Sequence, residues 1–266
     1  MKDRKKNSLT SSSKALAVTD PRAAILRAGG AVSRLGSLDA AQVDREADVV
    51  RVRDAEYVTR EGVVVADEVY FARDAKPTTD GPWLGEADKV AWRDPETGYD
   101  CIVLRHESDG TLGGYVGVPH GHPLWGFGAD AIPSGLDIDV HGGVTYARIC
   151  AERPASAPRR LAVEARRICH AHGARPRTQP VGAADRDAWW FGFRCDLVHD
   201  VIPGPRDHGR RRALEAEVGA IYRDDAYVIA EVGVFAAQLR AVADGEEVEP
   251  RSDPPPPAAL DPKRGS

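Results

Sequence analysis

Long apolar runs are scarce in this sequence, and none is predicted to reach the roughly 20 residues with which a helix crosses a bilayer. The first residues, Met1–Lys14, are basic and rich in serine, and they lack the apolar stretch of a secretory signal peptide. We therefore expect a soluble, cytoplasmic protein that does not contact a membrane.

Cysteine is also sparse, and the four cysteines form no C-x-x-C pair; they are Cys101, Cys150, Cys169 and Cys195. In a reducing compartment this spacing favours free thiols over metal ligation. The net charge is −5, so the composition gives no strong signal for nucleic-acid binding, although a local basic patch stays open. The Walker A, G-x-G-x-x-G, G-x-S-x-G and H-E-x-x-H motifs are absent, which disfavours kinases, dinucleotide-binding enzymes, α/β-hydrolases and zincins.

Composition divides the chain into four parts. The parts are a disordered basic tail (1–20), a variable segment with a small β meander (21–82), a core domain (83–245) with an insertion at 154–180, and a disordered proline-rich tail (246–266). Arg159–His172, inside the insertion, is expected to form a basic helix with a solvated face; the alternative is a phosphate or nucleic-acid contact.

Hydrophobic periodicity predicts the secondary structure of the core. The expected strands are Cys101–Arg105, Gly113–Val118, Leu136–Ala147 (two strands or one bulged strand) and Trp189–Val198; the expected helices are Arg210–Tyr222 and Asp224–Asp244. Strands come first and helices last, which predicts an α+β fold. We expect a largely antiparallel central sheet packed by the C-terminal helices, with a small β-rich N-terminal segment.

His141 is the first candidate for chemistry. On a strand, it would share a polar face with Asp137 and Asp139. Gly142 and Gly143 follow, and two residues without Cβ let a ligand approach the backbone, with Thr145 on the same face if no bulge intervenes. The alternative is a solvent-facing polar row that ends in a turn.

A second cluster, Asp196, His199 and Asp200, follows the aromatic run Trp189–Phe193. A carboxylate beside a histidine suits general acid–base work or metal ligation. The alternative is an ordinary charged strand end. We predict that His141 lines a pocket together with the segment Asp196–Asp200.

Two H-x-H pairs complete the candidates. On an extended segment, His120 and His122 would point the same way, as a metal ion requires, unless they belong to a surface turn. His170 and His172 lie in the expected basic helix, where this spacing separates the two rings. The second pair is therefore interpreted as structural.

Several of these motifs resemble a family of uncharacterised proteins from bacteriophages and prophage-associated bacterial genomes. The similar strings are Trp92–Tyr99 with Cys101, Gly113–Val118, His122-Pro123, Val140–Tyr146 (V-H-G-G-V-T-Y) and Trp189–Phe193 (W-W-F-G-F). Family members carry Asp directly after the aromatic run and His three positions later, where this chain has Arg194 and Leu197. The resemblance implies an accessory phage or prophage protein and brings no settled activity.

Two hypotheses for function follow. The first is a hydrolase or transferase acting on a small phosphorylated or nucleotide-like substrate. His141, His199 and Asp200 would be catalytic; Gly142, Gly143, Thr145, Asp196 and His122 would bind the substrate, and a divalent metal could assist. The second is a non-catalytic accessory protein that binds a host or phage partner, in which His141 would be a turn residue.

Overall fold

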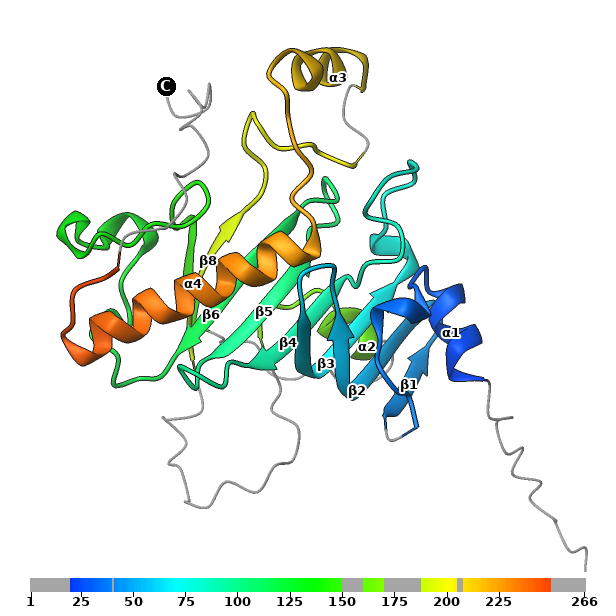
Figure 1. Ribbon diagram of the computed structural model, residues 1–266, viewed down its shortest axis with the longest axis horizontal. Coiled ribbons are helices and arrows are strands. Elements are labelled where there is room, and N and C mark those ends of the chain that lie inside the picture. Colours follow the sequence, from blue (N-terminus) through cyan, green and yellow to red (C-terminus); the bar gives the residue numbers. More distant parts are fainter. Residues whose placement is uncertain (1–19, 40, 150–159, 170–187, 205–207, 250–266) are drawn as a thin grey trace, which may run out of the picture.

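An antiparallel sheet of eight strands is the centre of the computed structural model, which describes residues 20–39, 41–149, 160–169, 188–204 and 208–249 (Figure 1). In sheet order the strands are β1 (Gln42–Glu46), β2 (Val49–Val58), β3 (Val63–Ala72), β4 (Lys89–Arg93), β5 (Asp100–Arg105), β6 (Leu112–Val118), β8 (Trp189–Arg194) and β7 (Tyr146–Ile149). The expected α+β class is therefore confirmed. The predictions for residues 1–19, 250–266, His170 and His172 lie outside the described residues.

The sheet runs without interruption from the N-terminal segment into the expected core domain. β3 pairs with β4 through Val69 opposite Val90, so residues before and after position 83 form one sheet. The turn at Asp109-Gly110 joins β5 to β6 as predicted, with Gly110 at φ 74°. The last two strands reverse chain order, because β8 lies between β6 and β7.

Helices lie on both faces of the sheet (Figure 1). On one face, α4 (Asp225–Asp244) packs across β5 and β6, and the buried residues of α1 (Pro21–Arg27) join the same apolar core. On the other face, α2 (Arg160–Glu164) packs near β1 and β2, while α3 (His208–Glu217) stands away from the sheet. Short 3-10 turns η1 (Val32–Arg34), η2 (Arg73–Ala75), η3 (Ala129–Ala131) and η4 (Ser134–Leu136) occupy connecting segments.

α4 has the boundaries and the buried stripe that its sequence predicts. The Asp224 carboxylate accepts a hydrogen bond from the Tyr227 amide at 3.0 Å, and Gly245 ends the helix in the left-handed conformation. Val228, Val232, Phe235 and Leu239 are each 0% exposed. The helix approaches β6 closely at Gly114, where a Cβ would lie 2.4 Å from Val232 Cγ2.

By length and hydropathy alone, α4 is long and apolar enough to cross a membrane. The sequence pattern predicted that no segment would be. The same criterion is met by core helices, and α4 buries one side against the sheet. The finding therefore gives weak evidence in either direction.

The predicted strand or strands over Leu136–Ala147 are wrong except at their end, where β7 begins at Tyr146. Asp137 is left-handed at φ 51°, Gly142 and Gly143 have φ of 68° and 79°, and residues 137–145 form no strand. Asp137, Asp139 and His141 therefore do not share a strand face.

The prediction of four free thiols is also wrong. Cys101 and Cys195 are free and buried, but Cys169 is disulfide-bonded. Burial raises the pKa of both free thiols well above the usual range, so neither is a reactive thiolate.

Candidate functional site

His141 is completely buried and joins two segments that are distant in sequence. Its Nε2 lies 2.8 Å from Asp200 Oδ2, and its Nδ1 lies 2.9 Å from the Tyr227 hydroxyl on α4. The exposed fractions of the His141 and Asp200 side chains are 0% and 1%. The structure thus brings together the predicted His141 and Asp200, and it adds Tyr227 as a third member.

The partners of Asp200 fix the direction of these hydrogen bonds. Burial opposes its ionisation, but hydrogen bonds and charge from His141 and Arg223 outweigh burial, so the pKa of Asp200 is lowered. A carboxylate has no proton to donate, so His141 Nε2–H donates to it. In the neutral imidazole, Nδ1 is then the acceptor for the Tyr227 O–H.

The loop that carries His141 is held along α4 by side chains rather than by a strand. Glu231 Oε1 accepts a hydrogen bond from the His141 amide at 2.6 Å. The Gln238 side chain accepts from the Asp139 amide and donates to the Asp139 carbonyl, each at 3.0 Å. Tyr227, Glu231 and Gln238 lie along one stripe of α4, so a single helix positions both the backbone and the ring of the His141 loop.

A groove of about 710 Å³ runs along this side of α4, and Tyr227 and Glu231 are part of its wall. The lining includes the acidic residues Glu61, Glu96, Glu231, Asp244, Glu246, Glu247 and Glu249. Arg240 is the basic residue among the described lining residues, and it pairs with Asp244 at 2.7 Å. The groove is therefore strongly acidic, and the His141 network adjoins it through Tyr227.

The other residues predicted for the second cluster do not contact His141 in any described interaction. His199 Nδ1 lies 3.4 Å from the Val218 carbonyl, and Asp196 pairs with Arg194 at 3.6 Å. Leu197 lies beside Gly142, where a Cβ would meet Leu197 Cδ1 at 3.0 Å. Asp200 is therefore the member of this cluster that bonds directly to His141.

Thr145 and Gly143 have backbone roles. The Thr145 amide donates to the Gly192 carbonyl at 2.9 Å, and the Gly143 amide closes a turn onto the Val140 carbonyl at 2.9 Å. The Thr145 side chain is exposed. Together with the positive φ of Gly142 and Gly143, these contacts indicate that the glycines shape the His141 loop.

His120 and His122 lie in a turn, the alternative to an extended pair, and they do not point the same way. His122 is buried, with Nε2 2.8 Å from the Leu239 carbonyl and Nδ1 accepting from the Leu124 amide. His120 is exposed and contacts the Trp125 ring, with 4.4 Å between centroids. The two residues lie in a tight turn rather than in an extended segment, so their rings separate.

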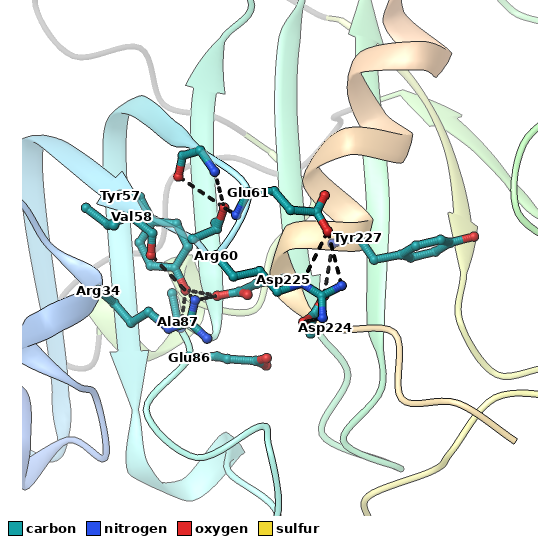
Figure 2. Close-up of polar contacts among 12 residues, drawn as sticks. Arg34, Tyr57, Val58, Arg60, Glu61, Glu86, Ala87, Asp224, Asp225 and Tyr227 are labelled. Carbon is teal, nitrogen blue, oxygen red and sulfur yellow. Dashed lines mark hydrogen bonds and ion pairs between the residues drawn. The ribbon is translucent and has the colours of Figure 1, made fainter. Parts of the chain in front are cut away.

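A second buried polar network lies at the start of α4 (Figure 2). Asp225 accepts from the Tyr57 hydroxyl at 2.6 Å and pairs with Arg34 at 3.1 Å. Nearby, the Tyr222 hydroxyl donates to Glu86 at 2.7 Å, and Glu86 pairs with the fully buried Arg105, also at 2.7 Å.

The segment Tyr222–Tyr227 connects this network to the His141 site. In Figure 2 the Tyr227 ring points away from Asp225, to the opposite side of the helix start. Arg223, between Tyr222 and α4, bonds to Asp200. The entry to α4 is therefore fixed on both sides by buried polar contacts.

Sequence reasoning missed Tyr227, Glu231, Gln238 and Arg223. Tyr227, Glu231 and Gln238 are spaced by four and seven residues, which is helical spacing beside the apolar stripe of α4. That polar stripe was a readable signal. Arg223 precedes the helix cap, and nothing in its local pattern distinguishes it.

Within the described residues, no three His, Cys, Asp or Glu side chains are grouped as a metal ion would require. Comparison of the chain with protein-family profiles, curated proteins and solved structures gives no match. The proposal for function consequently depends on the site itself.

Proposed function

We propose that the protein is a hydrolase or transferase in which the Tyr227 hydroxyl is the reactive group, activated by His141 and Asp200. One observation carries the proposal: two hydrogen bonds, of 2.8 and 2.9 Å, link Asp200, His141 and Tyr227 in series, and Tyr227 is part of the groove wall. A nucleophile bonded to a base that is itself oriented by a carboxylate is the general arrangement of an activated nucleophile.

The proposed chemistry follows from the direction of the hydrogen bonds. The Tyr227 oxygen attacks an electrophilic centre of the substrate while its proton moves to His141 Nδ1, and Asp200 stabilises the imidazolium through Nε2–H. The proton then passes to the leaving group. Water or a second acceptor, deprotonated by His141, displaces Tyr227 and completes hydrolysis or transfer.

The charge of the groove bears on the substrate. Seven acidic side chains in the wall favour a substrate with a cationic group. The acidic wall would repel a small phosphorylated or nucleotide-like substrate. An anionic probe in the test below represents this class of substrate.

A labelling experiment tests the proposal without a known substrate. An arylsulfonyl fluoride reacts with an activated phenol: the phenol oxygen bonds to sulfur, fluoride leaves and the proton goes to the base. We expect Tyr227 to be labelled faster than the other tyrosines, and an ammonium-bearing probe to react faster than a sulfonate-bearing probe. Peptide mass spectrometry would identify the labelled site.

Matched variants make the result specific. His141→Gln should lower Tyr227 labelling about 100-fold, the lower end of what a general base contributes. Tyr146→Phe, on the opposite face of the sheet, should leave the labelling unchanged. Equal labelling of wild type and a folded His141→Gln would contradict the relay.

The burial of His141 favours a second candidate, a non-catalytic accessory protein. Both ring nitrogens have internal partners and the side chain is 0% exposed, as expected of a residue that only locks the loop to α4. In that case no tyrosine labels selectively, and the acidic groove would bind a basic partner. Phage or prophage association and a cytoplasmic location stay predictions under both candidates.

A further inference from the structure

Arg223 contacts both ends of the hydrogen-bonded series. Its Nε lies 3.0 Å from Asp200 Oδ1, the carboxylate oxygen that does not face His141. Its guanidinium carbon lies 4.7 Å from the centroid of the Tyr227 ring. The Arg223 side chain is 15% exposed, so water screens these contacts only in part.

We propose that Arg223 is a positioning residue that sets the pH at which Tyr227 becomes reactive. This inference rests on the proposed function, because it assigns Arg223 an effect on the same nucleophile. Arg223 would act through Tyr227 and Asp200, without a bond to the substrate.

The direction of the effect follows from charge. A guanidinium stays protonated at all relevant pH values, so Arg223 is a fixed positive charge. A nearby positive charge favours the phenolate of Tyr227 over the phenol. This effect extends the reactivity of Tyr227 to lower pH.

Other charged groups act on Tyr227 from each element around it. They are His141 from the loop, Asp200 from the segment after β8, Asp224 and Glu231 from the helix start and α4, and Glu61 and Glu96 from the groove wall. The carboxylates among them oppose a phenolate, whereas Arg60, which pairs with Asp224 at 3.1 Å, is a further cation beside the helix start. The Arg223 guanidinium carbon lies 4.7 Å from the ring centroid, so its removal takes a positive charge away from this acidic surrounding.

The test is the pH profile of Tyr227 labelling by the ammonium-bearing arylsulfonyl fluoride, between about pH 5 and pH 10. Wild type is compared with the neutral variants Arg223→Gln and Arg223→Met and with the charged variant Arg223→Lys. We expect the midpoint to rise by about one pH unit or more in both neutral variants. Below the wild-type midpoint, their labelling rates should fall about tenfold, while Arg223→Lys should lie between them and wild type.

The outcomes separate this inference from the proposed function. A purely structural Arg223 would lower the unfolding temperature and leave the midpoint pH unchanged, and that result overturns the inference while the relay stands. Absence of selective Tyr227 labelling in wild type overturns both. If one of the two neutral variants does not unfold cooperatively and is therefore not properly folded, the midpoint pH of the other is sufficient for the test.

Discussion

At the scale of single residues, burial decides what His141 can do. A histidine on a solvent-facing row would be removable with little effect on folding. The structure instead places it at 0% exposure between Asp200 and Tyr227, with its amide bonded to Glu231. Any catalytic role is therefore combined with a structural one.

We predict that His141→Ala lowers the free energy of unfolding by about 2–4 kcal/mol, because it opens a cavity and leaves the Tyr227 hydroxyl without its acceptor. Urea unfolding gives the value. The matched control is His120→Ala, which removes an exposed ring and should change stability by no more than about 0.5 kcal/mol. A cost for His141→Ala as small as that of the control would show that the buried network is weak.

At the scale of elements, the sequence of α4 carries its own boundaries. Asp224 and Gly245 are local signals for the two ends of a helix, and the apolar spacing from Val228 to Leu239 predicts its buried side. Cys101–Arg105 and Gly113–Val118 likewise match β5 and β6 within one residue. Elements with local caps, turns or alternation could thus be predicted.

The His141 loop could not be predicted, because what holds it is remote in sequence. Leu136–Val140 alternates like a strand, but no strand in the described part of the chain pairs with it. Instead, Gln238 accepts from the Asp139 amide and Glu231 from the His141 amide. The meeting of His141 with Asp200 was predicted from the ends of two apolar segments. Asp200 does follow a strand, β8, but His141 lies in a loop rather than at a strand end.

The packing of α4 on the sheet depends on Gly114. An added Cβ there would lie 2.4 Å from Val232 and 2.6 Å from Phe193, both fully buried. We therefore predict that Gly114→Ala costs about 1–3 kcal/mol, as overpacking does. Gly121→Ala, which meets nothing within 4 Å, is the control and should be close to neutral. If Gly114→Ala and Gly121→Ala have equal unfolding midpoints, α4 moves away from β6 without cost to make room for the added methyl group.

At the scale of the whole molecule, buried charges join the layers on both faces of the sheet. On the α4 face, Arg105 and Glu86 are each 0% exposed and connect β5 to the segment before β4. On the other face, the Lys89 ammonium of β4 donates to the carbonyls of Glu164 and Cys169, at 2.8 and 2.9 Å. Lys89 thereby holds α2 and the residues after it against the sheet.

Lys89 gives the molecule a pH dependence with a defined sign. Burial lowers the pKa of Lys89 from 10.5 to about 8, with neighbouring acids opposing the shift. Between these values the unfolded chain holds a proton that the folded chain has lost, so unfolding takes up a proton and stability rises with pH. The contribution is complete above pH 10.5 and disappears as the pH falls through about 8.

The comparison of wild type with Lys89→Met isolates this contribution, because methionine fills similar space and does not titrate. We predict that the free energy of unfolding of wild type rises relative to that of the variant by up to about 1.4 kcal/mol for each pH unit in this range. Urea titrations at a series of pH values between about 7 and 10.5, with the disulfide of Cys169 kept intact, would measure the difference. If the free energies of unfolding of the two proteins change in parallel with pH, Lys89 ionises in the folded chain as it does in water. The contact between α2 and the sheet would then open without unfolding the rest of the chain.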